Sequence, residues 1–260
     1  TKLLILNNDF FMASETVSGP VEEATDAEVT AGTATGGTGG KLFITPTKLI
    51  TYLSSVNARS MLTTYFETSA RFTQQVDSGA SISFGTNGAV IDTTSASGRA
   101  CSIKMSVGST ANSVFTGSPI FSVSIVSASS PATSTSYFGM GEVTYSGSGH
   151  TYTTDHAGFK VVVSGSVASL YATQGDGSTE TASSALTTLT NTDTIHLMCR
   201  VNGSASIDYF WRKNGGAWST PTNLTTNMPN TASNILQFSV SNNATTSTNT
   251  YWLASASYSV

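Results

Sequence analysis

The acidic residues from position 75 onward are the first place to look for a reaction. A glycosidase needs two carboxylates about 5–10 Å apart, one on each side of the scissile bond. No E-x-D-x-E-like triplet places such acids along one strand, and Glu142 in GMGEVTY stands alone. The acids are instead scattered singly: Asp77, Asp92, Glu142, Asp155, Asp176, Glu180, Asp193 and Asp208. We therefore expect a protein that is not an enzyme.

Serine-nucleophile and metal chemistry find no better support. The members of a catalytic triad can come from anywhere in a chain, but no G-x-S-x-G motif stands between a strand and a helix. His150, Asp155 and His156 lie close together in SGSGHTYTTDHAGF, at a spacing that matches no familiar zinc site. Asp176 in QGDGST offers one ligand where calcium takes six to eight oxygens. We expect polar loops here, with no catalytic residue, metal or cofactor.

Aromatic residues in loops are the better candidates for binding. An exposed ring can stack on a sugar or insert into a protein groove, and binding residues concentrate on loops. Trp218 directly follows an expected hairpin turn, and the two tyrosines flank His150 in the glycine-serine loop. We expect Trp211 and Trp252 to fill the core. The candidate ligand-binding residues are therefore Trp218, Tyr145, Tyr152 and His150.

Composition narrows the class of protein. Charged residues make up 10% of the 260 residues, against about 25% in an ordinary soluble domain. The net charge is −4 and the cations are scattered, which argues against nucleic-acid binding. No apolar run approaches the roughly 20 residues that span a bilayer, and the opening LLIL is too short for a secretory signal. We expect neither a nucleic-acid partner nor membrane insertion.

Residues 75–260 read almost entirely as strands and turns. Segments such as SPIFSVSIVS alternate apolar and polar side chains, the pattern of a sheet with one buried and one wet face. Ser164–Gly165 and Asn214–Gly215 are hairpin signals. Cys101 and Cys199 fall on the apolar faces of their strands, which predicts two buried thiols. The pattern predicts an antiparallel β-sandwich or jelly roll that forms a display domain.

Residues 1–74 differ in character from the rest. Thr25 and Glu28 form a capping box for one short helix, and Pro46 suits the first turn of another. GTATGGTGGK separates them, and KLFI (41–44) reads as a short strand. We expect an N-terminal arm and attachment segment with short helices, joined to the display domain near residues 57–75.

This segment resembles the short module that recurs in tail-fibre and related virion proteins of tailed bacteriophages. The matching residues span about a tenth of the chain, from Ala27-Glu28-Val29 and Ala31-Gly32-Thr33 to Ile44-Thr45-Pro46 and Leu49. The resemblance implies a homotrimeric virion appendage that docks on other virion structural proteins. It implies a location on the virion, as a tail fibre or on the capsid surface, after assembly in the host cytoplasm. The attachment residues that it implies are Val29, Ile44, Pro46 and Leu49.

The β region is similar to a concanavalin-like lectin sandwich. RVNGS followed by IDYFWRKNGGAW resembles the glycine-turn hairpin of such domains, and NTYWLASASYSV resembles their closing strand. Together the two resemblances imply a phage structural protein that displays a lectin-like domain and can bind a host surface glycan. The alternatives are a capsid cement or decoration protein without a ligand, and a carbohydrate-binding module or glycosidase-like sandwich.

Overall fold

The computed structural model describes residues 22–23, 42–43, 62–107, 114–115, 118–129, 133–230, 233–246 and 248–259. The chain divides into two compact units, Thr1–Arg59 and Ser60–Val260. In the first unit, β1 (Glu22–Glu23) pairs in parallel with β2 (Leu42–Phe43), which lies inside the strand expected at 41–44. The expected helices and the attachment residues lie outside the described residues; these residues are Val29, Ile44, Pro46 and Leu49.

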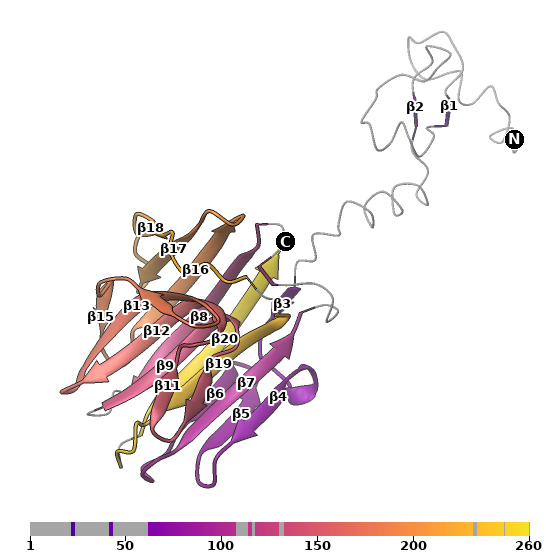
Figure 1. Cartoon of the computed structure of the whole chain (residues 1–260). Coiled ribbons are helices and arrows are strands. Elements are labelled where there is room, and N and C mark those ends of the chain that lie inside the picture. Colours follow the sequence, from indigo (N-terminus) through magenta and orange to yellow (C-terminus); the bar gives the residue numbers. More distant parts are fainter. Residues whose placement is uncertain are drawn as a thin grey trace, which may run out of the picture. The chain divides into compact units, whose positions relative to one another are not determined.

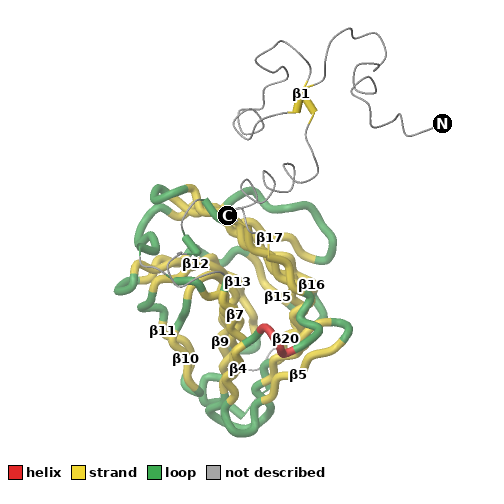
Figure 2. Tube along the Cα trace, turned by 90° about the vertical axis from the view of Figure 1, so that its right-hand side faces the viewer, coloured by secondary structure: helices red, strands yellow, loops and turns green. Residues whose placement is uncertain are grey.

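The second unit consists of two stacked antiparallel sheets (Figures 1 and 2). Sheet I runs, from edge to edge, β14 (Glu180–Ala182), β13 (Val167–Asp176), β12 (Asp155–Ser164), β9 (Thr133–Gly141), β19 (Ile235–Ser241), β7 (Ala100–Ser106) and β4 (Thr73–Val76), with β15 (Thr187–Leu189) also on β13. Sheet II runs β18 (Thr222–Leu224), β17 (Ser206–Lys213), β16 (Thr194–Asn202), β8 (Ile120–Ser129), β20 (Thr250–Ser259), β6 (Gly88–Asp92) and β5 (Ser81–Gly85), with β3 (Leu62–Thr64) also on β20.

Two small elements complete the described chain. The hairpin β10 (Thr144–Ser146) and β11 (Gly149–Thr151) lies on the outer side of sheet I (Figure 2). The 3-10 helix η2 (Ser69–Arg71) precedes β4. Within the described residues, no helix is long and apolar enough to cross a membrane. The two stacked antiparallel sheets confirm the sandwich that the alternating pattern predicts.

The core lies between the sheets because each strand sends alternate side chains inward. On β16, Ile195, Leu197, Cys199 and Val201 are buried, whereas the residues between them face outward. Aromatic rings from the two sheets meet edge to face, an arrangement worth about 0.5–1.5 kcal/mol beyond area burial. The pairs that bridge the sheets are Phe159–Tyr209, with ring centroids 5.5 Å apart, and Phe138–Tyr251, at 5.1 Å.

Both predicted hairpin turns are present and have the expected backbone. Asn214 (φ 52°) and Gly215 (φ 72°) both take left-handed conformations, and the Gly216 amide donates to the Lys213 carbonyl. Gly165 (φ 58°) and Ser166 (φ 65°) take the same conformations between β12 and β13, one residue later than the predicted pair Ser164–Gly165, because Ser164 pairs with Val167. Such turns match the twist of paired strands and select glycine and asparagine, which is why they were legible in the sequence.

Cys101 and Cys199 are fully buried free thiols in facing sheets, as expected. Each points into the core from its strand and packs there as a small aliphatic side chain would. Burial raises the pKa of Cys101 to about 12 and raises that of Cys199 further. Neither sulfur is therefore a nucleophile at neutral pH.

The sandwich unit starts before residue 75, where we expected the display domain to begin. Residues 62–64 form β3, which pairs with the central strand β20. Phe66 is completely buried and its ring contacts Phe72 at 5.1 Å and Phe238 at 5.2 Å between centroids. These contacts make β3 and Phe66 part of the sandwich unit rather than part of the arm.

A truncation series tests this boundary. We expect the fragment 60–260 to fold with the thermal midpoint of the full chain. The fragment 75–260 loses β3, the buried Phe66 and the partly buried Phe72, and we expect it to be at least about 3 kcal/mol less stable. Thermal and urea denaturation, each followed by tryptophan fluorescence, measure the midpoint and the free energy of unfolding. Equal stability of the two fragments would contradict the assignment of 60–74 to the sandwich.

Candidate ligand-binding surfaces

The structure brings three of the four predicted binding residues together on the outer side of sheet I. The rings of Tyr145, His150 and Tyr152 follow one another at centroid distances of 5.9 and 6.0 Å. Tyr152 continues the series to His156 and Tyr137, which stand on the sheet itself. This hairpin cluster of five rings lies where β10 and β11 rest on the sheet, so protein atoms occupy most of its ring faces.

Hydrogen bonds hold the hairpin cluster in place. The Nδ1 atom of His150 lies 2.8 Å from the Thr135 hydroxyl, which donates to Asn243 Oδ1 at 2.9 Å. The Thr135 oxygen therefore accepts from Nδ1–H, which leaves Nε2 as the acceptor for the Ser239 hydroxyl at 2.9 Å. This chain fits a neutral imidazole. Tyr145 is tied to the sheet through Ser102 at 2.5 Å.

Gln237 fastens the segment just before the hairpin. Its side-chain amide accepts from the Val143 amide at 2.8 Å and donates to the Val143 carbonyl at 3.0 Å. Val143 is completely buried beside Tyr137 and Tyr152. The geometry therefore gives the predicted residues Tyr145, His150 and Tyr152 a clear structural role, which is to cover the sheet.

The fourth predicted residue, Trp218, lies elsewhere. It follows the Asn214–Gly215 turn and is 42% exposed. The guanidinium carbon of Arg212 lies 4.9 Å from the centroid of its ring. Arg212 projects from the outer face of sheet II, the sheet opposite the hairpin cluster. The structure thus divides the predicted set between two surfaces.

Trp252 is the exposed aromatic that sequence reasoning missed. We expected it in the core, but it is 48% exposed on β20, whereas its neighbours Tyr251 and Leu253 are buried. The alternation in TYWL carried this signal, since Tyr251 and Leu253 share one face and Trp252 the other. The expectation that Trp211 fills the core agrees better with the structure, because Trp211 is partly buried and packs on the core.

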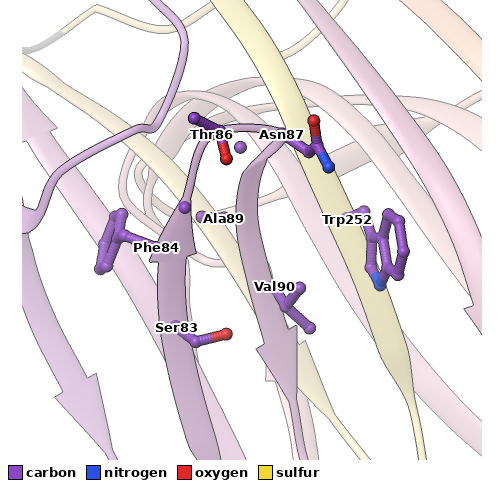
Figure 3. A pocket seen from close by; sticks show the side chains of 9 residues that line it. Ser83, Phe84, Thr86, Asn87, Ala89, Val90 and Trp252 are labelled. Atoms are coloured by element: carbon purple, nitrogen blue, oxygen red, sulfur yellow. The ribbon is translucent and has the colours of Figure 1, made fainter.

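A pocket of about 240 Å³ adjoins the Trp252 ring (Figure 3). Its floor is Val90, which pairs with Trp252 on one side and with Ser83 on the other. The turn between β5 and β6 adds Thr86 and Asn87 to the lining, so hydroxyl and amide groups border an apolar centre. Phe84 points away from Trp252, toward the core (Figure 3).

Gly88 permits this arrangement. Its φ of 111° lies in the region that glycine adopts readily, and a Cβ atom there would come within 2.1 Å of the Leu253 carbonyl oxygen. Only a glycine lets the β5–β6 turn lie this close to β20. The backbone therefore places the polar turn residues beside the indole.

The Trp252 pocket carries no formal charge, since none of its nine lining residues is acidic or basic. The nearest acid along β6, Asp92, accepts a hydrogen bond from the Thr94 amide at 2.5 Å. Across the described residues, no three His, Cys, Asp or Glu side chains gather in a way that could hold a metal ion. What the pocket offers is stacking plus neutral hydrogen bonding.

The hairpin cluster makes stability depend on pH. Burial lowers the pKa of His150 from 6.5 to about 3, and it also lowers the pKa of His156. As pH falls below about 6.5, the unfolded chain binds protons that the folded chain does not, so stability falls. The Asp193 and Asp208 carboxyls, whose pKa values are lowered by their hydrogen bonds, reduce the stability further only below about pH 4.

The urea midpoint should therefore decline as the pH is lowered from 8 to 5, and it should decline less steeply for His150→Gln. An unchanged slope in that variant would contradict the neutral imidazole.

Comparisons with known proteins agree on the fold. No protein-family model matches the chain, and no curated protein sequence matches it. The exoplasmic/lumenal domain of VIP36, in a Ca²⁺/Man2-bound form, aligns with a TM-score of 0.50 and 10% identity over 76% of this chain and 86% of that one. The CBM2 module of the evolved Dit of Lactobacillus casei BL23 phage J-1 aligns with a TM-score of 0.50 and 10% identity over 77% and 96%. The sandwich unit of this chain thus has the concanavalin-like, lectin-like β-sandwich fold.

Proposed function

We propose that this chain is a non-enzymatic structural protein of a tailed-phage particle whose sandwich binds a host surface glycan at the Trp252 pocket. One observation carries the glycan part: a tryptophan on a central strand is 48% exposed beside a pocket lined by hydroxyl and amide groups. Burying such a ring face in the core would stabilise the fold. Its exposure leaves an apolar plane free to stack on a sugar ring, with neutral hydrogen-bond partners at its edge.

The absence of catalysis in this proposal rests on where the carboxylates are. Glu142 forms an ion pair with Lys104, Glu180 pairs with Lys160, and no acid is among the residues that line the Trp252 pocket. A glycosidase needs two carboxylates on either side of its substrate. The pocket is therefore suited to binding without cleavage.

The virion part rests on the resemblance of the N-terminal segment. Val29, Ile44, Pro46 and Leu49 are the residues that would dock on a particle, and the same resemblance favours a homotrimer assembled with other virion proteins in the host cytoplasm. Among the structural neighbours, one is a module of a phage protein and another was solved with Man2. These two neighbours make a displayed lectin-like domain a sensible reading of the fold.

Removing the Trp252 ring tests the glycan site. We expect Trp252→Ala to weaken glycan binding at least about tenfold, or about 1.4 kcal/mol, with little change in thermal midpoint because the side chain is half exposed. A glycan array that includes bacterial surface polysaccharides identifies a ligand, and calorimetry then gives the affinities. Tyr171→Ala is the matched control, since Tyr171 is a partly exposed aromatic on β13, in the other sheet. Equal affinities for the two variants would exclude this pocket.

A charge placed in the N-terminal segment tests attachment. We expect Val29→Asp to lower the number of copies on assembled particles severalfold, because a buried unpaired carboxylate is costly at an interface. Quantitative blotting of purified particles measures the occupancy. Thr30→Asp introduces the same charge one residue away and serves as the control. Full occupancy with Val29→Asp would move the attachment point elsewhere in the chain.

A further inference from the structure

The outer face of sheet II continues beyond the Trp252 pocket. Cross-strand pairing sets two adjacent rows of side chains on this face. The row that contains the pocket runs Ser83, Val90, Trp252, Val126 and Thr194. The next row runs Ser255, Ser124, His196 and Arg212. Trp252 and Arg212 therefore belong to one continuous surface.

Arg212 is the unneutralised cation at the far end of this surface. On the same two strands, Arg200 pairs with Asp208 at 2.7 Å and Lys213 pairs with Asp193 at 3.4 Å. For Arg212 no carboxylate appears among the described ion pairs, and its buried Nε has no hydrogen-bond partner within the described part of the chain. Its guanidinium group instead lies over the Trp218 ring. A guanidinium group without a carboxylate partner, held beside an aromatic ring, suits a planar anion such as a carboxylate.

The electrostatics of the neighbouring histidine agree. The pKa of His196 is lowered, first by desolvation and then by the positive charge of Arg212. Its Nδ1 lies 2.6 Å from the Ser124 hydroxyl. The positive charge of Arg212 is thus felt across the row and is not cancelled there.

The surface between the two tryptophans is long and polar. Trp252 on β20 and Arg212 on β17 are separated by β8 and β16, which amounts to three strand spacings, or about 14 Å. The side chains that lie between them on β8 and β16 are Val126, Ser124, Thr194 and His196, two of which carry hydroxyl groups. A single sugar ring cannot contact both ends. Asp92 lies on the opposite side of the Trp252 row from Arg212, so negative charge on a ligand is favoured only toward Arg212.

We propose that the ligand is an extended acidic glycan that lies across the outer face of sheet II. One sugar stacks on Trp252, and a carboxylate further along the chain binds Arg212 beside Trp218. This inference rests on the proposed glycan site and adds the chemical class, length and direction of the ligand. It also explains why Trp218 is held by Arg212 instead of being packed in the core.

The test compares charged and uncharged forms of the same ligand on the full chain. Short and long oligomers of uronic acid are titrated together with their methyl-esterified, neutral counterparts. We expect the long charged oligomers to bind at least about tenfold more tightly than either the short or the esterified ones, and to weaken as salt rises. We also expect Arg212→Gln to remove that preference for charge while it leaves stacking on Trp252 intact.

Matched variants separate the outcomes. Arg71→Gln removes the same charge from an exposed site outside sheet II, and it should bind like the unaltered chain. If Arg212→Gln and Arg71→Gln behave alike, or if esterified oligomers bind equally well, the acidic-glycan inference is wrong while the Trp252 site stands. If neither uronate oligomers nor the array polysaccharides bind, the proposed function fails as well. If Trp252→Ala instead lowers the mass of the chain in solution, this face joins copies of the protein, and both proposals are overturned.

Discussion

The inward packing of alternate side chains is the constraint on which the rest of the structure depends. Both sheets bury the face that meets the other sheet, and edge-to-face aromatic pairs such as Phe159–Tyr209 connect the two sheets across the core. Because a slip of one residue in any strand would exchange its faces, the core fixes the register of every strand. The same register decides which side chains remain outside. The positions of Trp252 and Arg212 on one surface are thus a consequence of core packing.

The outer faces of the two sheets differ in how far the chain itself covers them. Sheet I is covered by its own chain, since Gln237 and His150 attach the segment from Val143 to β11 through neutral hydrogen bonds. Among the described residues no such hairpin lies on the outer face of sheet II, which carries Ser124 and Thr194 between Trp252 and Arg212. A covered face contributes stability, whereas an open face with aromatic ends is available to a partner. This difference supports the proposal that binding takes place on sheet II.

The class of fold could be read from the sequence because strand periodicity and turn chemistry are local signals. The pair Asn214–Gly215 predicts a hairpin turn, and the alternation of apolar residues on β16 predicts which face of that strand is buried. The site could be read only in part. Tyr145, His150 and Tyr152 looked like loop residues, and nothing local shows that a hairpin folds back onto a sheet through contacts with residues about 90 positions away, such as Ser239. Trp252 was misjudged because a large aromatic was assumed to be inside, although its own strand pattern placed it outside. The start of the unit was set too late since Phe66 reaches the core through an isolated turn rather than a periodic strand.

The two cysteines have a consequence for where such a domain can work. Cys101 and Cys199 stand in facing sheets and are completely buried, and each remains a free thiol. No covalent cross-link between them holds the sandwich together, and neither sulfur is open to an oxidant or to exchange with another thiol. The fold therefore does not depend on the redox state of its surroundings. The domain can reach the same structure in a reducing compartment and keep it in an oxidising one.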